Sequence, residues 1–274
     1  MSTATVTPTP AATAVGGTAR ERAVPAPIPF TRILSVEARK MFDTRSGFWL
    51  MAGIVIAAVI ATALTIILGD RSDLTFDSFA AAVGIPMSVL LPIIGVLAVT
   101  SEWSQRNALT TFTLVPSRSR VIAAKLTNTL IIGAVSMVIA LGVGALGNLV
   151  VAGTQGFDAV WDIPGWQFAQ IVLANELGML LGFVLGLLFR SSPAAIVGYF
   201  VLDFVLPNLS EALASVQHWW ADNAAWFDFN QTRFLLFDTS LSGQEWLQLG
   251  LTTAIWIALP LLIGLRLVLR SEVK

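Results

Sequence analysis

Residues 100–125 read TSEWSQRNALTTFTLVPSRSRVIAAK and separate two long apolar runs, 79–99 and 126–151. Each run is close to the roughly 20 residues that an α-helix needs to cross a bilayer. The stretch between them is the longest polar segment on its predicted side of the membrane. Such a segment carries no solute by itself, but it can receive a push from a partner protein and pass it to both flanking helices.

Apolar runs of similar length recur along the chain, which is 55% hydrophobic and only 12% charged. This composition predicts an all-α integral membrane protein, because each run is too long for a core strand. The six predicted spans are 48–68, 79–99, 126–151, 166–189, 193–209 and 246–265. Pro86 and Pro92 lie inside the second span, where we expect the helix to be kinked.

The distribution of charge predicts the orientation. With six spans, both termini lie on the same side, and all of the 16 Arg and Lys residues except Arg71 and Arg233 fall on that side. Positively charged loops favour the cytoplasm. Both termini and the 100–125 loop are therefore expected to be cytoplasmic.

Two segments precede the first span. Residues 1–29 are rich in Thr, Ala and Pro, which predicts a disordered cytoplasmic tail rather than a signal peptide. Residues 30–44 have apolar side chains at helical spacing and predict an amphipathic helix on the membrane surface. Glu37 projects near the middle of its apolar face. This carboxylate either reaches out at the helix edge or pairs with Lys40 or a neighbouring segment.

Glu176 and Asp203 are the two ionisable residues well inside the predicted spans, both in the outer half of the membrane. Charge in hydrocarbon is costly, so such side chains usually face the bundle interior or a wet cavity. No Lys or Arg of a predicted span can pair with them. They form a site for a cationic substrate or an outer gate, or they join helices through hydrogen bonds with Asn175 assisting, unless Arg233 enters the membrane to meet them.

Two further features concern packing. Gly178, Gly182 and Gly186 share one face of the fourth span and allow another helix backbone to approach, within the chain or across a dimer. A substrate path along this face is the alternative. Residues 207–245 contain a dense group of Trp and Phe, which predicts short helices lying on or dipping into the outer leaflet.

Several kinds of site are excluded by the residues that the chain lacks. It has no Cys, and its only His is His218, so thiolate sites and sites built on several histidines are excluded. Lys40, Lys125 and Lys274 are the three lysines and none of them follows a Gly, which rules out a phosphate-binding loop of the Walker A type. No catalytic residues, metal site or cofactor are predicted, and an ATP-driven reaction needs a separate ATPase.

The 100–125 loop has its own predicted structure. Thr100 or Ser101 can cap a helix that begins near Glu102, and Glu102 and Arg106 have the spacing of a favourable ion pair. Trp103, Leu109, Phe112 and Leu114 make the segment more apolar than a solvated loop requires. We expect the loop to dock a protein; the alternative is a plain solvated loop that obeys the charge rule.

These patterns resemble the permease subunits of ABC-2-type transporters, above all bacterial exporters, over most of residues 30–270. In the loop the resemblance rests on SEWSQRNALTTFTLVPSRSRVIAAK. Before the first span it rests on VEARKMFDTRSGFW, where Glu37, Lys40 and Arg45 match an E-x-x-K-x-x-x-x-R run. The long Thr/Pro tail is a departure from the family.

The resemblance implies a specific architecture. An interfacial connecting helix would carry Glu37, Lys40 and Arg45, and a coupling helix near 102–112 would contact the ATPase. The contacting residues would be Glu102, Trp103, Arg106, Leu109 and Phe112. Re-entrant outer helices would lie between spans five and six, and two permease chains would assemble with two ATPase chains that hold ATP and Mg.

The sequence therefore favours the membrane subunit of an ATP-driven exporter of a hydrophobic or amphiphilic compound, in a bacterial plasma membrane. It contains no nucleotide site of its own and is not itself an enzyme. A stand-alone ion- or proton-coupled carrier that uses Glu176 and Asp203 is one alternative. A non-transporting membrane scaffold that docks a partner through the 100–125 loop is another.

Overall fold

The computed structural model describes residues 28–43, 45–70, 74–104, 117–156, 158–238 and 240–270, and these residues form helices and no strand. Within these described ranges, six helices are long and apolar enough to cross a membrane. They span Gly47–Leu68, Phe76–Trp103, Arg118–Thr154, Gly165–Phe189, Ser192–Val216 and Gly243–Arg270. The chain is thus an all-α, multi-pass membrane protein, as its hydropathy predicts. The predicted tail, 1–29, lies outside the described residues except for its last two positions.

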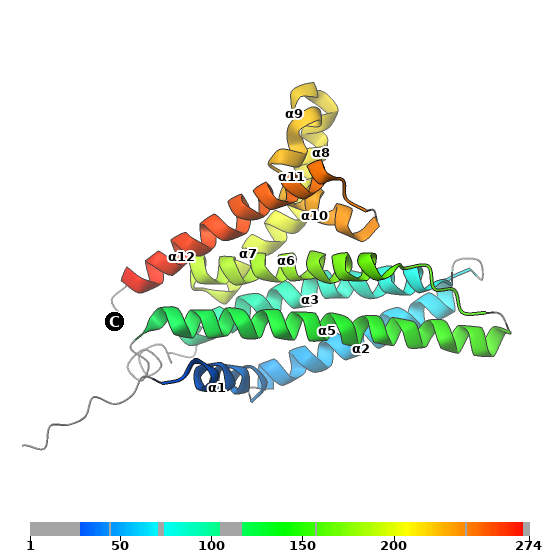
Figure 1. The fold of residues 1–274 in the computed structure, drawn as a ribbon, viewed down its shortest axis with the longest axis horizontal. Coiled ribbons are helices and arrows are strands. Elements are labelled where there is room, and N and C mark those ends of the chain that lie inside the picture. The colour runs from blue at the N-terminus through cyan, green and yellow to red at the C-terminus, as the bar shows by residue number, and fades with distance from the viewer. Residues whose placement is uncertain are drawn as a thin grey trace, which may run out of the picture.

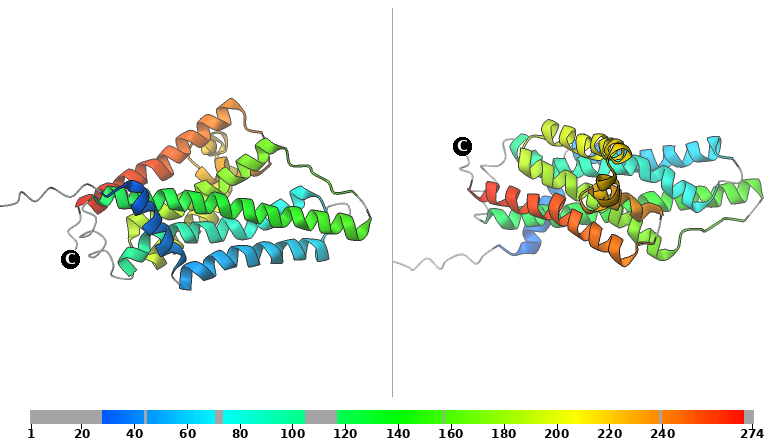
Figure 2. Two further views of the ribbon diagram at one scale, coloured as in Figure 1. Left: turned by 60° about the horizontal axis from the view of Figure 1, so that its bottom comes forward. Right: turned by 90° about the horizontal axis from the view of Figure 1, so that it is seen from above.

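Four long helices form the body of the molecule: α2 (Arg45–Leu68), α3 (Phe76–Ser104), α5 (Arg118–Gln155) and α6 (Gly165–Phe189). They run along the long axis of the molecule, with the amphipathic α1 (Phe30–Phe42) beside one end (Figures 1 and 2). Helix α2 exposes apolar side chains on its outer side, where Ile67 is 73% exposed and Leu68 is 76% exposed. Exposed apolar side chains of this kind suit a helix that faces hydrocarbon.

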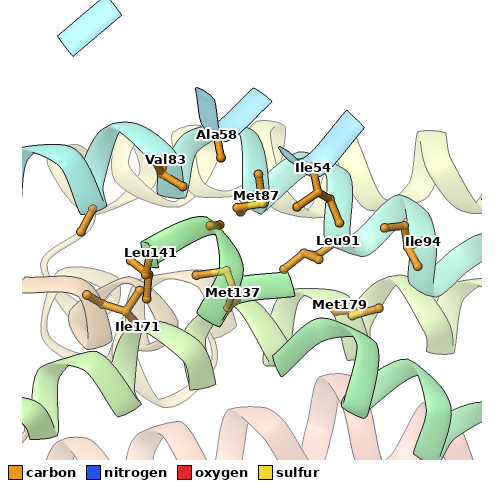
Figure 3. Packing of buried hydrophobic residues seen from close by; sticks show 12 residues of the cluster. Ile54, Ala58, Val83, Met87, Leu91, Ile94, Met137, Leu141, Ile171 and Met179 are labelled. Atoms are coloured by element: carbon orange, nitrogen blue, oxygen red, sulfur yellow. The ribbon is translucent and has the colours of Figure 1, made fainter. Parts of the chain in front are cut away.

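The core of the body is a set of interlocking aliphatic and thioether side chains. Figure 3 shows residues from all four long helices pointing toward one another. They are Ile54 and Ala58 of α2, Val83, Met87, Leu91 and Ile94 of α3, Met137 and Leu141 of α5, and Ile171 and Met179 of α6. Because all four helices contribute, this packing sets their relative positions.

The chain after Phe189 diverges from this body. It contains α7 (Ser192–Phe200), the π-helix η2 (Val201–Val205), α8 (Leu206–Val216), α9 (His218–Asn223), the 3₁₀ turn η3 (Ala224–Trp226) and α10 (Phe229–Asp238). The chain then returns through α11 (Gly243–Thr253), the π-helix η4 (Ala254–Ala258) and α12 (Leu259–Arg270). In Figure 1, α7 and α8 lead away from the long axis to α9, and α11 and α12 slope back toward the C-terminal end.

Several predicted helix boundaries differ from the observed ones. The third span, predicted at 126–151, belongs to a helix that runs from Arg118 to Gln155. The fifth span, predicted to end at residue 209, continues through η2 and α8 to Val216, because α8 prolongs the helix past the apolar run. The second span is a single helix through Pro86 and Pro92 and reaches Ser104. The aromatic segment after the fifth span does contain short helices, α9, η3 and α10; their depth in a membrane stays a prediction.

Both described ends of the chain lie beside the start of α5. Arg118 donates from Nη1 to the carbonyl of Val268, 3.0 Å away, and Arg120 donates from Nη2 to the carbonyl of Ile28, 2.7 Å away. An even number of spans requires this arrangement. Arg118 and Arg120 therefore lie at the same end of the bundle as both described ends of the chain.

Candidate functional site

The end of α3, the start of α5 and the helix α1 meet at one end of the bundle. Helix α1 turns Ile33 and Glu37 inward and keeps Arg32 and Arg39 exposed, as its amphipathic pattern predicts. Asn128 of α5 donates from Nδ2 to the carbonyl of Leu34, 2.9 Å away, which fixes α1 along α5.

Glu37 and Lys40 of α1, Glu102 of α3 and Lys125 of α5 form a cluster of four charges. Lys125 Nζ lies 2.7 Å from Glu37 Oε2 and 3.0 Å from Glu102 Oε1. Lys40 Nζ lies 2.8 Å from Glu37 Oε1 and 3.2 Å from Glu102 Oε1. Each lysine therefore contacts both acids, and the cluster joins three helices.

Most of the four-charge cluster is buried, so breaking one of its ion pairs would destabilise the fold. Glu37, Glu102 and Lys125 are each at most 5% exposed, whereas the side chain of Lys40 is 40% exposed. Burial would lower the pKa of Lys40, but its hydrogen bonds and ion pairs with Glu37 and Glu102 outweigh that effect and raise the pKa above its ordinary value. Two positive and two negative charges balance, which is what buried ions require.

The cluster answers the question that the sequence left open for Glu37. Its carboxylate is paired both with Lys40 and with a neighbouring helix, rather than reaching solvent at the edge of α1. Sequence reasoning did not single out Lys125, which counted only as one more cytoplasmic positive charge. A lysine before an apolar span ordinarily extends toward water, so nothing in the local sequence separates Lys125 from Arg118 or Arg120.

The predicted coupling helix does not begin at Glu102. Helix α3 continues without a break through Ser104. The hydroxyl of Thr100 donates to the carbonyl of Val96, 2.9 Å away, so Thr100 is an interior residue of that helix and not a cap. The carboxylate of Glu102 faces α1 and α5 and is not on the surface that a partner would touch.

The remaining loop residues of the prediction fall in two groups. Arg106, Leu109 and Phe112 lie outside the described residues, as does the side chain of Arg45, whose backbone begins α2. Trp103 is described, and the guanidinium carbon of Arg190 lies 5.8 Å from its ring centroid. Because Arg190 ends α6, this contact ties the end of α3 to the turn before α7.

A second buried ion pair lies farther along the bundle. Arg233 of α10 donates from Nη2 to Oδ1 of Asp203, which the π-helix η2 carries, and both side chains are 2% exposed. The guanidinium also lies 4.9 Å from the ring centroid of Phe234. Arg233 thus enters the apolar region to meet Asp203, one of the alternatives that the sequence allowed.

Glu176 has a different environment. Both of its carboxylate oxygens are buried and have no hydrogen-bond partner among the described residues. Asn175 does not assist it, because the Asn175 amide donates to the carbonyl of Ile171 in its own helix. The alternative in which these two residues join helices through hydrogen bonds is therefore not observed among the described residues. The carboxyl group of Glu176 instead packs against Gly133 of α5.

The glycine face of α6 lies mainly against α3. A Cβ at Gly182 would collide with the backbone of Pro92, and one at Gly186 would lie 3.0 Å from the carbonyl oxygen of Val96. Gly178 lies under the guanidinium of Arg233. The three glycines therefore make close contacts within the chain.

No protein-family model matches the chain, and no curated protein matches its sequence.

Proposed function

We propose that the chain is the membrane-spanning permease subunit of an ATP-driven exporter of the ABC-2 type. The four-charge cluster carries the proposal. It joins α1 to the ends of α3 and α5, the two helices that flank the 105–116 segment. A subunit that must pass motion from a docked ATPase into its spans needs such a rigid connection at this position.

The cluster provides a route by which motion of the 105–116 segment would reach the membrane helices. Removing one member of a buried ionic group leaves an uncompensated charge, so α1, α3 and α5 are expected to move as one body. Motion imposed on the 105–116 segment then reaches two membrane helices together. Rigid-body movement of this kind changes access to a binding site when the two states differ in substrate affinity.

The proposal includes partners and location. A separate cytoplasmic ATPase, present in two copies, binds ATP and Mg, and a second permease chain completes the transporter. The chain lies in a bacterial plasma membrane with both termini and the 105–116 segment in the cytoplasm. The basic residues gathered at one end of the bundle support this orientation.

A pull-down tests the proposal. A tagged chain is purified from its native membranes in mild detergent, and ATPase activity in the eluate is measured. Residues 105–112 are scrambled in one variant, which leaves Glu102 and Lys125 intact, so the bundle is expected to insert normally. The matched control is Glu211→Gln, an exposed acid of α8 at a distance from the cluster.

We expect ATPase activity to co-purify with the wild-type chain and with Glu211→Gln, and to be lost with the scrambled variant. A well-folded chain that never brings an ATPase with it contradicts the proposal.

A stand-alone proton-coupled carrier is the second candidate, and the unpartnered carboxyl group of Glu176 favours it. Asp203 is a weaker coupling group than the sequence suggests, because Arg233 already neutralises it. Transport that stops when the proton gradient is dissipated, but persists after ATP depletion, would select this candidate. Glu176→Gln should then abolish transport, with Asp77→Asn as a control in an exposed acid.

A further inference from the structure

A cavity of about 310 Å³ is lined by residues of α6, η2, α8, α9, α10 and η4 and of the turn before α10. Its size is at the lower end of the roughly 300–1,000 Å³ typical of small-molecule sites. The lining is mostly apolar and aromatic. It comprises Leu181, Leu202, Leu206, Leu209, Ser210, Leu213, Trp220, Phe227, Asp228, Phe229, Asn230 and Trp256.

The indole N–H groups of the two tryptophans in this lining already donate hydrogen bonds to the protein. Trp220 donates from Nε1 to Oγ of Ser210, 3.1 Å away, and Trp256 donates from Nε1 to the carbonyl of Phe227, 2.8 Å away. The rings of Trp220 and Phe227 are stacked, with centroids 6.2 Å apart and planes inclined by 21°. The wall therefore offers ring faces, which attract a cation through the negative charge of their π systems.

Asp228 supplies the one formal charge of the lining. Its Oδ1 accepts hydrogen bonds from the backbone N–H groups of Asn230, at 3.0 Å, and Gln231, at 3.2 Å. These bonds hold the carboxylate at the start of α10. Within the described part of the chain no Lys or Arg lines the cavity, and no salt bridge to Asp228 is found.

The cavity continues into an apolar strip on α8. Leu206, Leu209 and Leu213 line it and are also 37%, 58% and 44% exposed. They follow one another at helical spacing, so they form one surface along α8. An alkyl chain that enters the cavity can extend along this surface.

We propose that this cavity binds an amphiphilic organic cation. The ammonium head lies against the carboxylate of Asp228 and the rings of Trp220, Phe227 and Trp256, and the alkyl tail lies along the leucines of α8. An anionic head would meet the Asp228 carboxylate with no compensating cation. The binding site is a property of this chain alone, whereas its role as a cargo site rests on the proposed export function.

Equilibrium binding to the purified full-length chain in an uncharged detergent tests the inference. The probes are octyltrimethylammonium and its neutral isostere, in which a tert-butyl head replaces the ammonium. Asp228→Asn removes the charge but keeps an acceptor at the start of α10, because Asn is as good a helix cap as Asp. Asp222→Asn is the matched control, since this exposed acid of α9 does not line the cavity.

We expect the wild-type chain to prefer the cation, and Asp228→Asn to weaken cation binding about five- to tenfold without affecting the isostere. Phe227→Leu should also weaken cation binding selectively, while its backbone carbonyl still accepts from Trp256. Asp222→Asn should have no effect. Equal binding of cation and isostere to the wild type, or equal effects of the two Asp→Asn variants, overturns the inference.

The outcome is separable from that of the transport proposal. Selective cation binding by a chain that recruits no ATPase would leave the site standing and remove the exporter. ATPase recruitment by a chain that does not prefer the cation would leave the exporter standing and remove this site.

Discussion

The ammonium of Lys125 lies 2.7 Å from Oε2 of Glu37, so the start of one membrane-spanning helix neutralises a carboxylate that the preceding surface helix buries. The same lysine holds Glu102 at the end of α3. One side chain thus joins both borders of the 105–116 segment to α1. Its removal should disturb all three helices at once.

Lys125→Met should destabilise the chain strongly. It leaves Glu37 and Glu102 buried with only the half-exposed Lys40 between them, and breaking a buried ion pair costs about 3–5 kcal/mol. Unfolding followed by tryptophan fluorescence in detergent measures the loss. Arg39→Met, an exposed cation of α1, should change stability by less than about 0.5 kcal/mol.

A double variant tests whether the charges of the cluster stabilise the fold together. Glu37→Gln combined with Lys125→Met leaves Lys40 to pair with Glu102, so the double variant should be more stable than Lys125→Met alone. If the two losses simply add, the four residues do not act as one cluster.

Gly182→Ala should destabilise the packing of α6 on α3. The added methyl group meets the backbone of Pro92, which cannot move aside as a flexible side chain would. Overpacking of this kind costs about 1–3 kcal/mol. Gly142→Ala is the matched control, because no atom lies within 4 Å of a Cβ there and that helix position is exposed. Equal stability of the two variants in a thermal unfolding assay would contradict the observed contact.

Arg233→Met should destabilise the outer part of the chain by leaving Asp203 buried and unpaired. The combination of Arg233→Met with Asp203→Asn removes both charges and should recover part of the loss. Arg233→Lys should be more stable than Arg233→Met but less stable than the wild type, because a lysine lacks the planar group that lies over Phe234. The fraction of monodisperse protein that survives heating, measured by size-exclusion chromatography, ranks the variants. A double variant as unstable as Arg233→Met would show that the pair is not the cause.

Glu176→Gln should leave the fold as stable as the wild type or make it more stable. A buried carboxyl group with no partner contributes no hydrogen bond, and the amide avoids burying a charge. Asn148→Ala provides the contrast, because Asn148 donates to the carbonyl of Val160 at 2.9 Å and its loss should cost about 1 kcal/mol. If Glu176→Gln is the more damaging of the two, Glu176 has a partner in the folded protein.

The sequence predicted the elements much better than it predicted their partners. Residues 48–68 are helical because a backbone in hydrocarbon must satisfy its own hydrogen bonds, a local requirement that hydropathy reveals. Glu37 stands out in the sequence because burying a carboxylate on an apolar helix face costs free energy unless a cation pairs with it. Which cation meets it depends on how α5 packs, and that information is distributed over the whole core.

The same limit explains the two errors around polar residues. Thr100 looks like a helix cap when only its neighbours are read, yet its hydroxyl bonds within α3, because the helix continues to Ser104. Asn175 stands next to Glu176 in sequence, but neighbours in a helix point in different directions, and its amide bonds back to Ile171.

The sequence alone determined that this is a multi-pass helical membrane protein with basic residues gathered at one end, because hydropathy and charge act on each segment by itself. Only the tertiary structure decided that Lys125 pairs with Glu37 and Glu102 and that Arg233 reaches Asp203. It also decided that the Glu176 carboxylate has no hydrogen-bond partner among the described residues, and that an aromatic cavity with one carboxylate forms beside α8. Those features arise from contacts between residues far apart in the chain. They exist only once the core has set how the helices lie against one another.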